Sequence, residues 1–283
     1  MSATYHELLL DTRRRLEQAG VSGAQLEARF IVGHACGKNR DELVRDAQLH
    51  VTAEKMAAVD ELVTRRLSDE PLAYILGEWE FMGRTIEVTR DTLIPRSDTE
   101  ILCEQAMDAL GEGGRLLDLC CGSGCVGLCA IADVKNATAV LCDLVKPTLA
   151  VARRNARKLG LSARALFIGE DALLPLPEAL GKFDVIVSNP PYIPHGDLAS
   201  LDRSVRGYEP MAALDGGDDG LDFYRAFARN LKRVLNDGGR AMFEVGAGQA
   251  RAVADIFARA GWTVDEIVRD LAGTERVVKC GLD

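Results

Sequence analysis

The sequence has no long run of apolar residues. No stretch approaches the ~20 uninterrupted apolar positions that a membrane-spanning helix requires. The N-terminal residues MSATYHE also lack the basic segment followed by an apolar segment with which a secretory signal begins. We therefore expect a cytoplasmic location and no membrane partner.

The sequence also lacks an excess of basic residues. It has 34 Lys and Arg against 43 Asp and Glu, which gives a formal net charge of −9. A protein that binds nucleic acid by neutralising phosphates normally carries a basic face. The short basic clusters at 13–15 and 153–154 lie at helical positions and are typical of solvated helix faces. The charge balance predicts no direct nucleic-acid binding.

The eight cysteines form no Cys-x-x-Cys pair with a histidine nearby. Cys120 and Cys121 are adjacent, and Cys125 and Cys129 follow at helical spacing, which is unlike the framework of a disulfide-rich secreted protein. Free cysteine usually behaves as a small buried hydrophobe. We therefore expect that these cysteines do not bind a metal ion. Instead, we expect them to pack a helix against a sheet.

The length of 283 residues predicts more than one domain. Residues 1–75 are expected to form a helical bundle, in which Ser22 caps the second helix and Thr52 the third. Pro71 ends this region because proline disfavours helix at the residue before it. The residues of the second helix that we expect to face inward are Leu26, Phe30 and Ile31.

Residues 76–96 are expected to form a hairpin linker. The segments 78–81 and 85–88 alternate in polarity, and 82–84 supply a turn between them. Residues 97–100, Ser-Asp-Thr-Glu, have the pattern of a capping box that begins a helix.

Residues 97–283 alternate between strands and helices. This pattern predicts an α/β domain with a mostly parallel sheet and helices on both faces. The expected strands are 116–119, 139–142, 165–168, 183–188, 240–245 and two around Val264 and Val277, and the expected helices include 125–132, 147–159 and 223–235.

A glycine-containing loop follows the first of these strands and begins a helix, where open α/β sheets bind ligands. Glycine lets the backbone approach a bound group, and the helix N-terminus offers free N–H donors. The spacing is not that of a dinucleotide fingerprint. The candidate cofactor-binding residues here are Asp118, Cys120, Cys121, Gly122, Ser123 and Gly124.

Acidic residues follow the next two strands. Asp143 lies about 20 residues beyond the glycine loop, where a carboxylate can accept the two hydroxyls of a ribose. Asp171 and Ala172 follow the third strand and are candidates for recognising the edge of an adenine. These positions indicate a nucleoside-containing cofactor.

The segment Asn189-Pro190-Pro191-Tyr192 follows the fourth strand. Two successive prolines fix φ and remove two backbone donors, so the Asn189 side-chain oxygen and the Pro190 carbonyl are both able to accept hydrogen bonds. Paired acceptors suit a target that bears an NH₂ group, and Tyr192 could lie flat against a planar amide or base. His195 is expected to be a loop residue and not a general base.

The longer pattern resembles the HemK-type glutamine N5-methyltransferases of peptide chain release factors. The matching segments span most of the chain and are 71–77, 93–96, 189–192, 216–221, 243–246 and 270–276. The resemblance implies a seven-stranded, Rossmann-like class I methyltransferase sheet over 97–283 and a helical N-terminal domain that docks the substrate.

The same resemblance implies S-adenosylmethionine as the cofactor, S-adenosylhomocysteine as the product and class I release factors as the protein substrate. It also implies that Arg96 belongs to the substrate site with residues 189–192. Two positions depart from the family pattern. Cys120 and Cys121 stand where glycine is common, and Ser97 stands where the family often has proline.

Three other functions share some of these features. A ribosomal-protein glutamine methyltransferase would need the same site. A DNA or RNA adenine-N6 methyltransferase needs the same paired acceptors, although the net charge of −9 disfavours it. A non-enzymatic adaptor with this fold is disfavoured by the intact residues Gly122, Gly124, Asp143 and Asn189.

Overall fold

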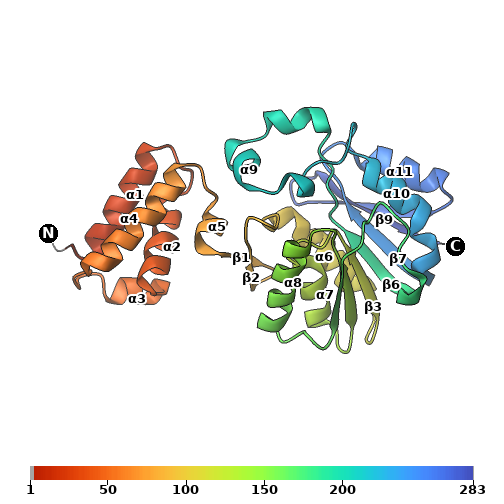
Figure 1. Ribbon diagram of the computed structural model, residues 1–283, viewed down its shortest axis with the longest axis horizontal. Helices are drawn as coiled ribbons and strands as arrows, with labels where there is room; N and C mark the ends of the chain where they lie inside the picture. The colour runs from red at the N-terminus through yellow and green to blue at the C-terminus, as the bar shows by residue number, and fades with distance from the viewer. Residues whose placement is uncertain (1–2, 283) are drawn as a thin grey trace. The chain divides into compact units, whose positions relative to one another are not determined.

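The computed structural model describes residues 3–282, and these divide into two compact units (Figure 1). The smaller unit comprises the described residues up to Gly77 together with Arg203–Tyr208. The larger unit comprises Glu78–Asp202 and the described residues from Glu209 onward. No helix within residues 3–282 combines the length and apolar character needed to cross a membrane.

The smaller unit is helical, as expected. Its helices are α1 (Tyr5–Gln18), α2 (Ala24–Cys36), α3 (Arg40–Arg45), α4 (Ala53–Leu67), α5 (Leu72–Leu76) and α9 (Arg203–Tyr208). The Thr52 hydroxyl accepts the backbone N–H of Lys55 and caps α4, as predicted. The predicted cap of α2 is wrong, because its N-cap is Gly23 in a left-handed conformation and no side chain caps the helix.

The predicted inward face of α2 is partly wrong. Ile31 is buried, but Leu26 is 57% exposed and Phe30 is 44% exposed. The buried face is formed instead by Ala24, Ala28 and Ile31, which follow one another at i, i+4 and i+7. Small residues at the first two positions let α2 pack against α1 and α4, and this places Leu26 and Phe30 toward solvent.

The larger unit contains a seven-stranded sheet of order β5-β4-β3-β6-β7-β9-β8. Its strands are β3 (Arg115–Leu119), β4 (Thr138–Cys142), β5 (Ala165–Ile168), β6 (Phe183–Ser188), β7 (Leu235–Glu244), β8 (Thr263–Arg269) and β9 (Glu275–Gly281). All neighbours pair in parallel except β9, which is antiparallel to both β7 and β8. The mostly parallel sheet is confirmed. Strand order reverses between β3 and β6, and such switch points form a crevice at the carboxyl ends of the strands.

Helices cover both faces of this sheet (Figure 1). One face carries α6 (Ser97–Ala109), α7 (Cys125–Asp133) and α8 (Lys146–Lys158), and the other carries α10 (Asp222–Asn230) and α11 (Ala250–Arg259). Rings pack beneath α10 and α11, where Phe243 stacks between Phe227 and Phe257 at centroid distances of 5.4 and 4.7 Å. Short 3-10 helices lie in the connections: η1 (Glu178–Leu180), η2 (His195–Ser200), η3 (Met211–Ala213) and η4 (Lys232–Val234).

The helix expected over 223–235 ends earlier than predicted. It stops at Asn230, η4 follows, and β7 already begins at Leu235 instead of at residue 240. Leu235 pairs with Phe183 of β6, and the register then shifts before Val185 pairs with Arg240. This tertiary pairing overrides the helical pattern of the local sequence.

The hairpin is confirmed as β1 (Glu78–Phe81) and β2 (Arg84–Glu87). Its two-residue turn has positive φ at both Met82 and Gly83, as hairpin turns of this length favour. The hairpin belongs to the larger unit, where the Asn155 side chain of α8 hydrogen-bonds both the N–H and the carbonyl of Glu87. The domain boundaries at 75 and 96 stay a prediction.

The capping box predicted at 97–100 is wrong. Arg96 is the N-cap of α6, and no side chain caps the helix. Glu100, the residue expected to complete the box, accepts the backbone N–H of Met82 at 2.7 Å. Its carboxylate therefore links the hairpin to α6 instead of capping the helix.

Candidate active site

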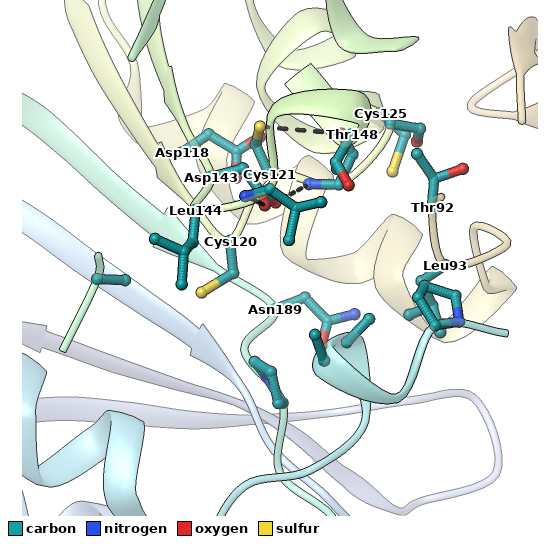
Figure 2. Close-up of a pocket in the computed structure, with 18 of the residues that line it drawn as sticks. Thr92, Leu93, Asp118, Cys120, Cys121, Cys125, Asp143, Leu144, Thr148 and Asn189 are labelled. Atoms are coloured by element: carbon teal, nitrogen blue, oxygen red, sulfur yellow. Dashed lines mark hydrogen bonds between the residues drawn. The ribbon is translucent and has the colours of Figure 1, made fainter. Parts of the chain in front are cut away.

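A cavity of about 330 Å³ lies within the larger unit (Figure 2). It is lined by the loop after β3, by residues after β4 and β6, by Asp171, Ala172 and Leu173, and by segments 90–96 and 210–213. Most of the candidate residues therefore meet in one place, as the carboxyl ends of neighbouring parallel strands require. Of the predicted site residues, those that line the cavity are Arg96, Asp118, Cys120, Cys121, Gly122, Ser123, Asp143, Asp171, Ala172, Asn189 and Pro191.

The loop after β3 has an unusual backbone. Cys120, Gly122 and Gly124 have φ values of 55°, 56° and 78°, all in the left-handed region that glycine tolerates best. A Cβ on Gly124 would come within 2.9 Å of Leu141 and 3.0 Å of Leu128. Gly124 does not line the cavity itself but lets the loop pack onto β4. Cys120 is a non-glycine residue in this conformation, which costs about 1–2 kcal/mol.

The side chain of Asp118 fixes the position of the loop after β3. Its buried carboxylate accepts the backbone N–H of Gly127 in α7 at 2.9 Å. A Cβ on Gly127 would come within 2.8 Å of that carboxylate, so the close approach depends on glycine. Burial raises the pKa of Asp118 to about 7. Asp118 thus fixes the first turn of α7 against β3, besides lining the cavity.

Asp143 follows β4 and joins the loop to α8. Its Oδ2 accepts the N–H of Gly122 and its Oδ1 accepts the N–H of Val145, each at 3.0 Å. Burial raises the pKa of Asp143, and these two hydrogen bonds act against that rise. A carboxylate has more lone pairs than these two bonds use, so both oxygens can still accept hydroxyls in the cavity. The binding of a ribose by Asp143 stays a prediction.

Two leucines lie beside the acidic residues at this end of the cavity. Leu144 follows Asp143 and is 64% exposed, and Leu173 follows Ala172 and is also exposed. The Asp171 carboxylate accepts the N–H of Leu173 at 2.9 Å. The leucines give the cavity an apolar wall that suits a flat purine. Sequence reasoning missed them, although an apolar residue one or two positions after each carboxylate, Leu144 after Asp143 and Leu173 after Asp171, was the available signal.

Only two of the four residues in the turn at 189–192 line the cavity. Asn189 and Pro191 line it, whereas Pro190 and Tyr192, both described by the structure, are not among its lining residues. The Asn189 Nδ2 donates to Oγ1 of Thr99 at 3.1 Å. Cys120 lies between Asp143 and Asn189 in the view of Figure 2. Asn189 and the loop after β3 therefore line the same cavity.

Tyr192 packs against the hydrophobic core of the sheet. Burial raises the pKa of its phenol to about 12. Its backbone carbonyl accepts Nε2 of Gln249 at 2.9 Å, and Oε1 of Gln249 accepts the N–H of Gly246 at 2.9 Å. A Cβ on Gly220 would lie 2.2 Å from the Tyr192 carbonyl oxygen. The 216–221 segment and Gln249 therefore hold the turn in place from behind its backbone.

Arg96 lies at the cavity and forms an ion pair with Glu209, whose side chain is almost fully buried. The other carboxylate oxygen of Glu209 accepts the N–H of Ile94 at 3.2 Å. Glu209 thereby ties the segment after α9 to the loop that precedes α6. Thr99 and Phe223 line the cavity although the sequence did not single them out, and a polar residue one turn into α6 was the only signal for Thr99. Glu209 was missed as well; it does not line the cavity but holds Arg96 and the N–H of Ile94.

His195 was expected to be a loop residue, but it begins the short 3-10 helix η2. It is exposed, and its Nδ1 lies 2.8 Å from the Asp215 carboxylate, which raises the pKa of the imidazole. Within residues 3–282 no three His, Cys, Asp or Glu side chains are grouped so that they could hold a metal ion.

Comparison with known proteins identifies the family to which this chain belongs. A model described as the PrmC N-terminal domain matches residues 7–77, and one described as the methyltransferase small domain matches residues 97–202. The chain is 40% identical to a release factor glutamine methyltransferase of Geobacter sulfurreducens, over 97% of this chain and 95% of that protein. It is 42% identical to one of Rhodospirillum rubrum, over 93% of this chain and 80% of that protein. The chain belongs to the release factor glutamine methyltransferase family.

A solved methyltransferase structure from Pyrococcus furiosus has a similar fold. It is 17% identical, with a TM-score of 0.54 over 77% of this chain and 98% of that one. Membership of the release factor glutamine methyltransferase family confirms the fold class, methyltransferase activity and S-adenosylmethionine as cofactor, all of which the sequence predicts. The roles of the individual site residues stay predictions.

Proposed function

We propose that this protein transfers a methyl group to the side-chain amide nitrogen of the glutamine in the Gly-Gly-Gln loop of class I peptide chain release factors. The observation that supports it most directly is the place of Asn189. Its side-chain amide lines the same cavity as Asp143 and the loop after β3, and Thr99 holds it by a hydrogen bond. A cofactor site and a hydrogen-bonding group for the target amide thus adjoin.

The residues of the cavity fit S-adenosylmethionine. The carboxylate of Asp143 would accept the ribose hydroxyls, Leu144 and Leu173 would flank the adenine, and the loop at 120–123 would hold the amino-acid part. Gly122 has open space where a Cβ would stand, and its N–H is already directed at Asp143. When bound, the cofactor supplies an electrophilic methyl group on its sulfonium.

The protein's task is to position a poor nucleophile. An amide nitrogen is poor because its lone pair is delocalised into the carbonyl, the same resonance that stiffens peptide bonds. Asn189 Oδ1 and the Pro190 carbonyl would each accept one N–H of the glutamine and orient its lone pair. The two oxygens also stabilise the positive charge that develops on nitrogen, which is preorganised electrostatics. Proximity supplies much of the remaining rate enhancement.

The methylated amide is a strong acid in its cationic form, so water can take its proton and no general base is required. Because the Tyr192 side chain packs against the hydrophobic core and Gln249 donates to its backbone carbonyl, we assign Tyr192 to holding the turn instead of holding the plane of the target amide. Arg96, which lines the cavity and pairs with Glu209, would contact the release factor near the glutamine.

We further propose that the smaller unit docks the release factor, with domains at 1–75 and 97–283 joined by the hairpin at 76–96. Exposed apolar side chains on the described part of this unit support a binding role, because they include Leu26 and Phe30 on one helix. The proposed partner is a protein of the translation machinery, so the protein would act in the cytoplasm without direct contact to nucleic acid.

The test uses purified protein, S-adenosylmethionine with a labelled methyl group and a release factor as substrate. We expect one methyl group per release factor, located by mass spectrometry on the glutamine of the Gly-Gly-Gln loop. A release factor in which this glutamine is replaced by alanine is the matched control and should remain unlabelled. Labelling of ribosomal proteins or of an adenine-containing oligonucleotide, with none of the release factor, would contradict the proposal.

A further inference from the structure

A buried carboxylate lies directly beside the turn that carries Asn189. Ser188 at the end of β6 pairs with Phe243 of β7, so the next residues on the two parallel strands, Asn189 and Glu244, are neighbours. The α6 helix, which carries Thr99, packs against both strands. Thr99 and Glu244 are each only 2% exposed. Asn189 and Thr99 line the cavity, whereas Glu244 does not.

The side-chain amide of Asn189 can adopt two orientations of nearly the same shape. One presents the acceptor Oδ1 to the cavity and the other presents the donor Nδ2. Only the first can accept an N–H from a target amide. The proposed reaction therefore needs something that fixes this rotation, and an asparagine that is merely packed in place would not supply it.

Hydrogen bonding to a neighbouring side chain selects the first orientation of the Asn189 amide. Asn189 Nδ2 donates to Thr99 Oγ1 at 3.1 Å. The Glu244 carboxylate lies near both side chains, whose polar groups lower its pKa, and its buried Oε2 has no hydrogen-bond partner among the described residues, so it can accept one. An ionised carboxylate only accepts, and a threonine hydroxyl has a single proton. When that proton goes to Glu244, Thr99 can only accept from Asn189. Both amide hydrogens then point toward Thr99 and Glu244, and Oδ1 is left for the cavity.

We propose that Glu244 and Thr99 form a positioning relay that fixes the rotation of the Asn189 amide so that its oxygen faces the target nitrogen. The inference rests on the function proposed above, and it assigns to two residues outside the predicted site a role in the rate of methyl transfer. Neither residue touches the reacting atoms.

The charges around Glu244 make the relay sensitive to pH. Burial raises the pKa of Glu244 to about 7. The nearby polar groups of Thr99 and Asn189 and the charge of Arg276 lower it, and the charge of Asp98 raises it further. The charge of Glu244 also raises the pKa of the Tyr192 and Tyr224 phenols, and the Tyr224 hydroxyl donates to the backbone carbonyl of Glu244 at 2.7 Å. Once protonated, Glu244 can donate to Thr99, and Thr99 no longer has to accept from Asn189. Turnover should therefore rise as pH increases through about 7.

The first experiment compares two variants of Thr99 that differ in the hydroxyl. Thr99→Val removes the hydroxyl at nearly constant shape and should lower kcat about 10-fold or more, with KM for S-adenosylmethionine changed less than about threefold. Thr99→Ser keeps the hydroxyl and should retain kcat within about threefold. Thr12→Val is the matched control, because Thr12 is equally buried in the smaller unit and its hydroxyl has no partner among the described residues.

The second variant, Glu244→Gln, places an amide that can donate where the carboxylate only accepts. It should lower kcat and abolish the rise of kcat through pH about 7 that the unmodified protein shows. Thermal unfolding and cofactor binding establish that each variant is folded. Unchanged kcat in folded Thr99→Val, or an unchanged pH profile in folded Glu244→Gln, overturns the relay.

Asn189→Ala separates failure of the relay from failure of the proposed function. If Asn189→Ala is inactive while Thr99→Val is fully active, the function stands and the relay is wrong. If Asn189→Ala turns over normally on a release factor, the proposed function is wrong and the relay falls with it.

Discussion

The carboxylate of Asp143 accepts the backbone N–H of Gly122 at 3.0 Å. This bond joins the end of β4 to the loop after β3, so the two strands present one continuous polar edge to the cavity. A second bond, from the N–H of Val145 to the same carboxylate, connects that edge to the start of α8. The group proposed to bind the ribose therefore also sets the shape of the loop beside it.

Replacing Asp143 should weaken cofactor binding. Asp143→Asn keeps the size of the side chain but converts one acceptor oxygen into a donor, so it cannot both accept the two backbone N–H groups and bind two hydroxyls. We expect affinity for S-adenosylmethionine to fall about 10-fold or more, measured by isothermal titration calorimetry. Asp41→Asn, on an exposed helix of the smaller unit, is the control and should bind normally. Equal affinities of the two variants would remove Asp143 from the cofactor site.

The loop after β3 offers a matched pair of glycines. Gly122 and Gly124 both have positive φ, but only Gly124 has neighbours within reach of an added Cβ, at 2.9 and 3.0 Å. We expect Gly122→Ala to lower the free energy of unfolding by about 1–2 kcal/mol through backbone strain alone. Gly124→Ala should cost about 1–3 kcal/mol more because the side chain also overpacks the contact with β4. Urea denaturation of both variants measures the difference, and equal losses would show that strain alone requires glycine here.

Much of the fold could be predicted because its signals are local. β5 and β6 have the predicted bounds, since each is a short apolar run flanked by polar residues or glycine. The predictions are wrong where contacts with distant segments decide which residues are buried or which strands pair. Nothing in the sequence of α2 shows that Ala24 and Ala28 form the buried face, and nothing near Leu235 shows that it pairs with Phe183.

The residues of the site also fall into two groups: those that a local sequence signal predicts and those that only tertiary packing brings to the cavity. Asp143 and Asn189 were found because each follows a buried strand, and the carboxyl ends of parallel strands meet at one edge. Thr99 comes from a helix that lies before the first strand of the sheet, so no strand-end pattern points to it. Glu244 did carry a signal, because it is a carboxylate that directly follows the buried apolar residues 241–243 at the end of a strand, but its neighbours could be identified only from the structure.

The packing of the 189–192 turn predicts a second effect on turnover. A Cβ on Gly220 would lie 2.2 Å from the Tyr192 carbonyl oxygen and 2.7 Å from Gln249 Nε2. Gly220→Ala must therefore displace the turn, and we expect kcat to fall about 10-fold or more because the acceptors move relative to the methyl group. Gly238→Ala has a similar φ of 74° but nothing within 4 Å, so it should lose stability without losing kcat. If the two variants have the same kcat, the 216–221 segment does not set the turn.

Buried carboxylates predict how stability depends on pH. The pKa of Asp118 is raised to about 7 by burial, from about 3.9 in the unfolded chain. The unfolded state thus loses its proton first, and the free energy of unfolding should fall as pH rises from about 5 to about 8, by up to about 3 kcal/mol. Asp118→Asn removes this ionisation and should reduce the fall.

The comparison is made by denaturant unfolding of the cofactor-free protein at a series of pH values. Glu244, whose pKa burial also raises to about 7, contributes in the same direction and remains in the variant, so the fall should shrink without vanishing. A pH dependence of Asp118→Asn identical to that of the unmodified protein would mean that Asp118 is ionised in both states or in neither.

The most direct test of the acceptor role concerns Asn189. Asn189→Ala removes Oδ1 and leaves the backbone acceptor of Pro190, so one of the two proposed hydrogen bonds to the target is lost. We expect turnover on a release factor to fall by about 100-fold or more, the size of effect seen when a preorganised hydrogen-bonding group is removed from a transition state. Affinity for S-adenosylmethionine should stay within about threefold, because Asp143 and the loop after β3 are unaltered. A variant that lost cofactor affinity and turnover to the same degree would place Asn189 in the cofactor site instead, and the target amide would then need another acceptor from the cavity wall.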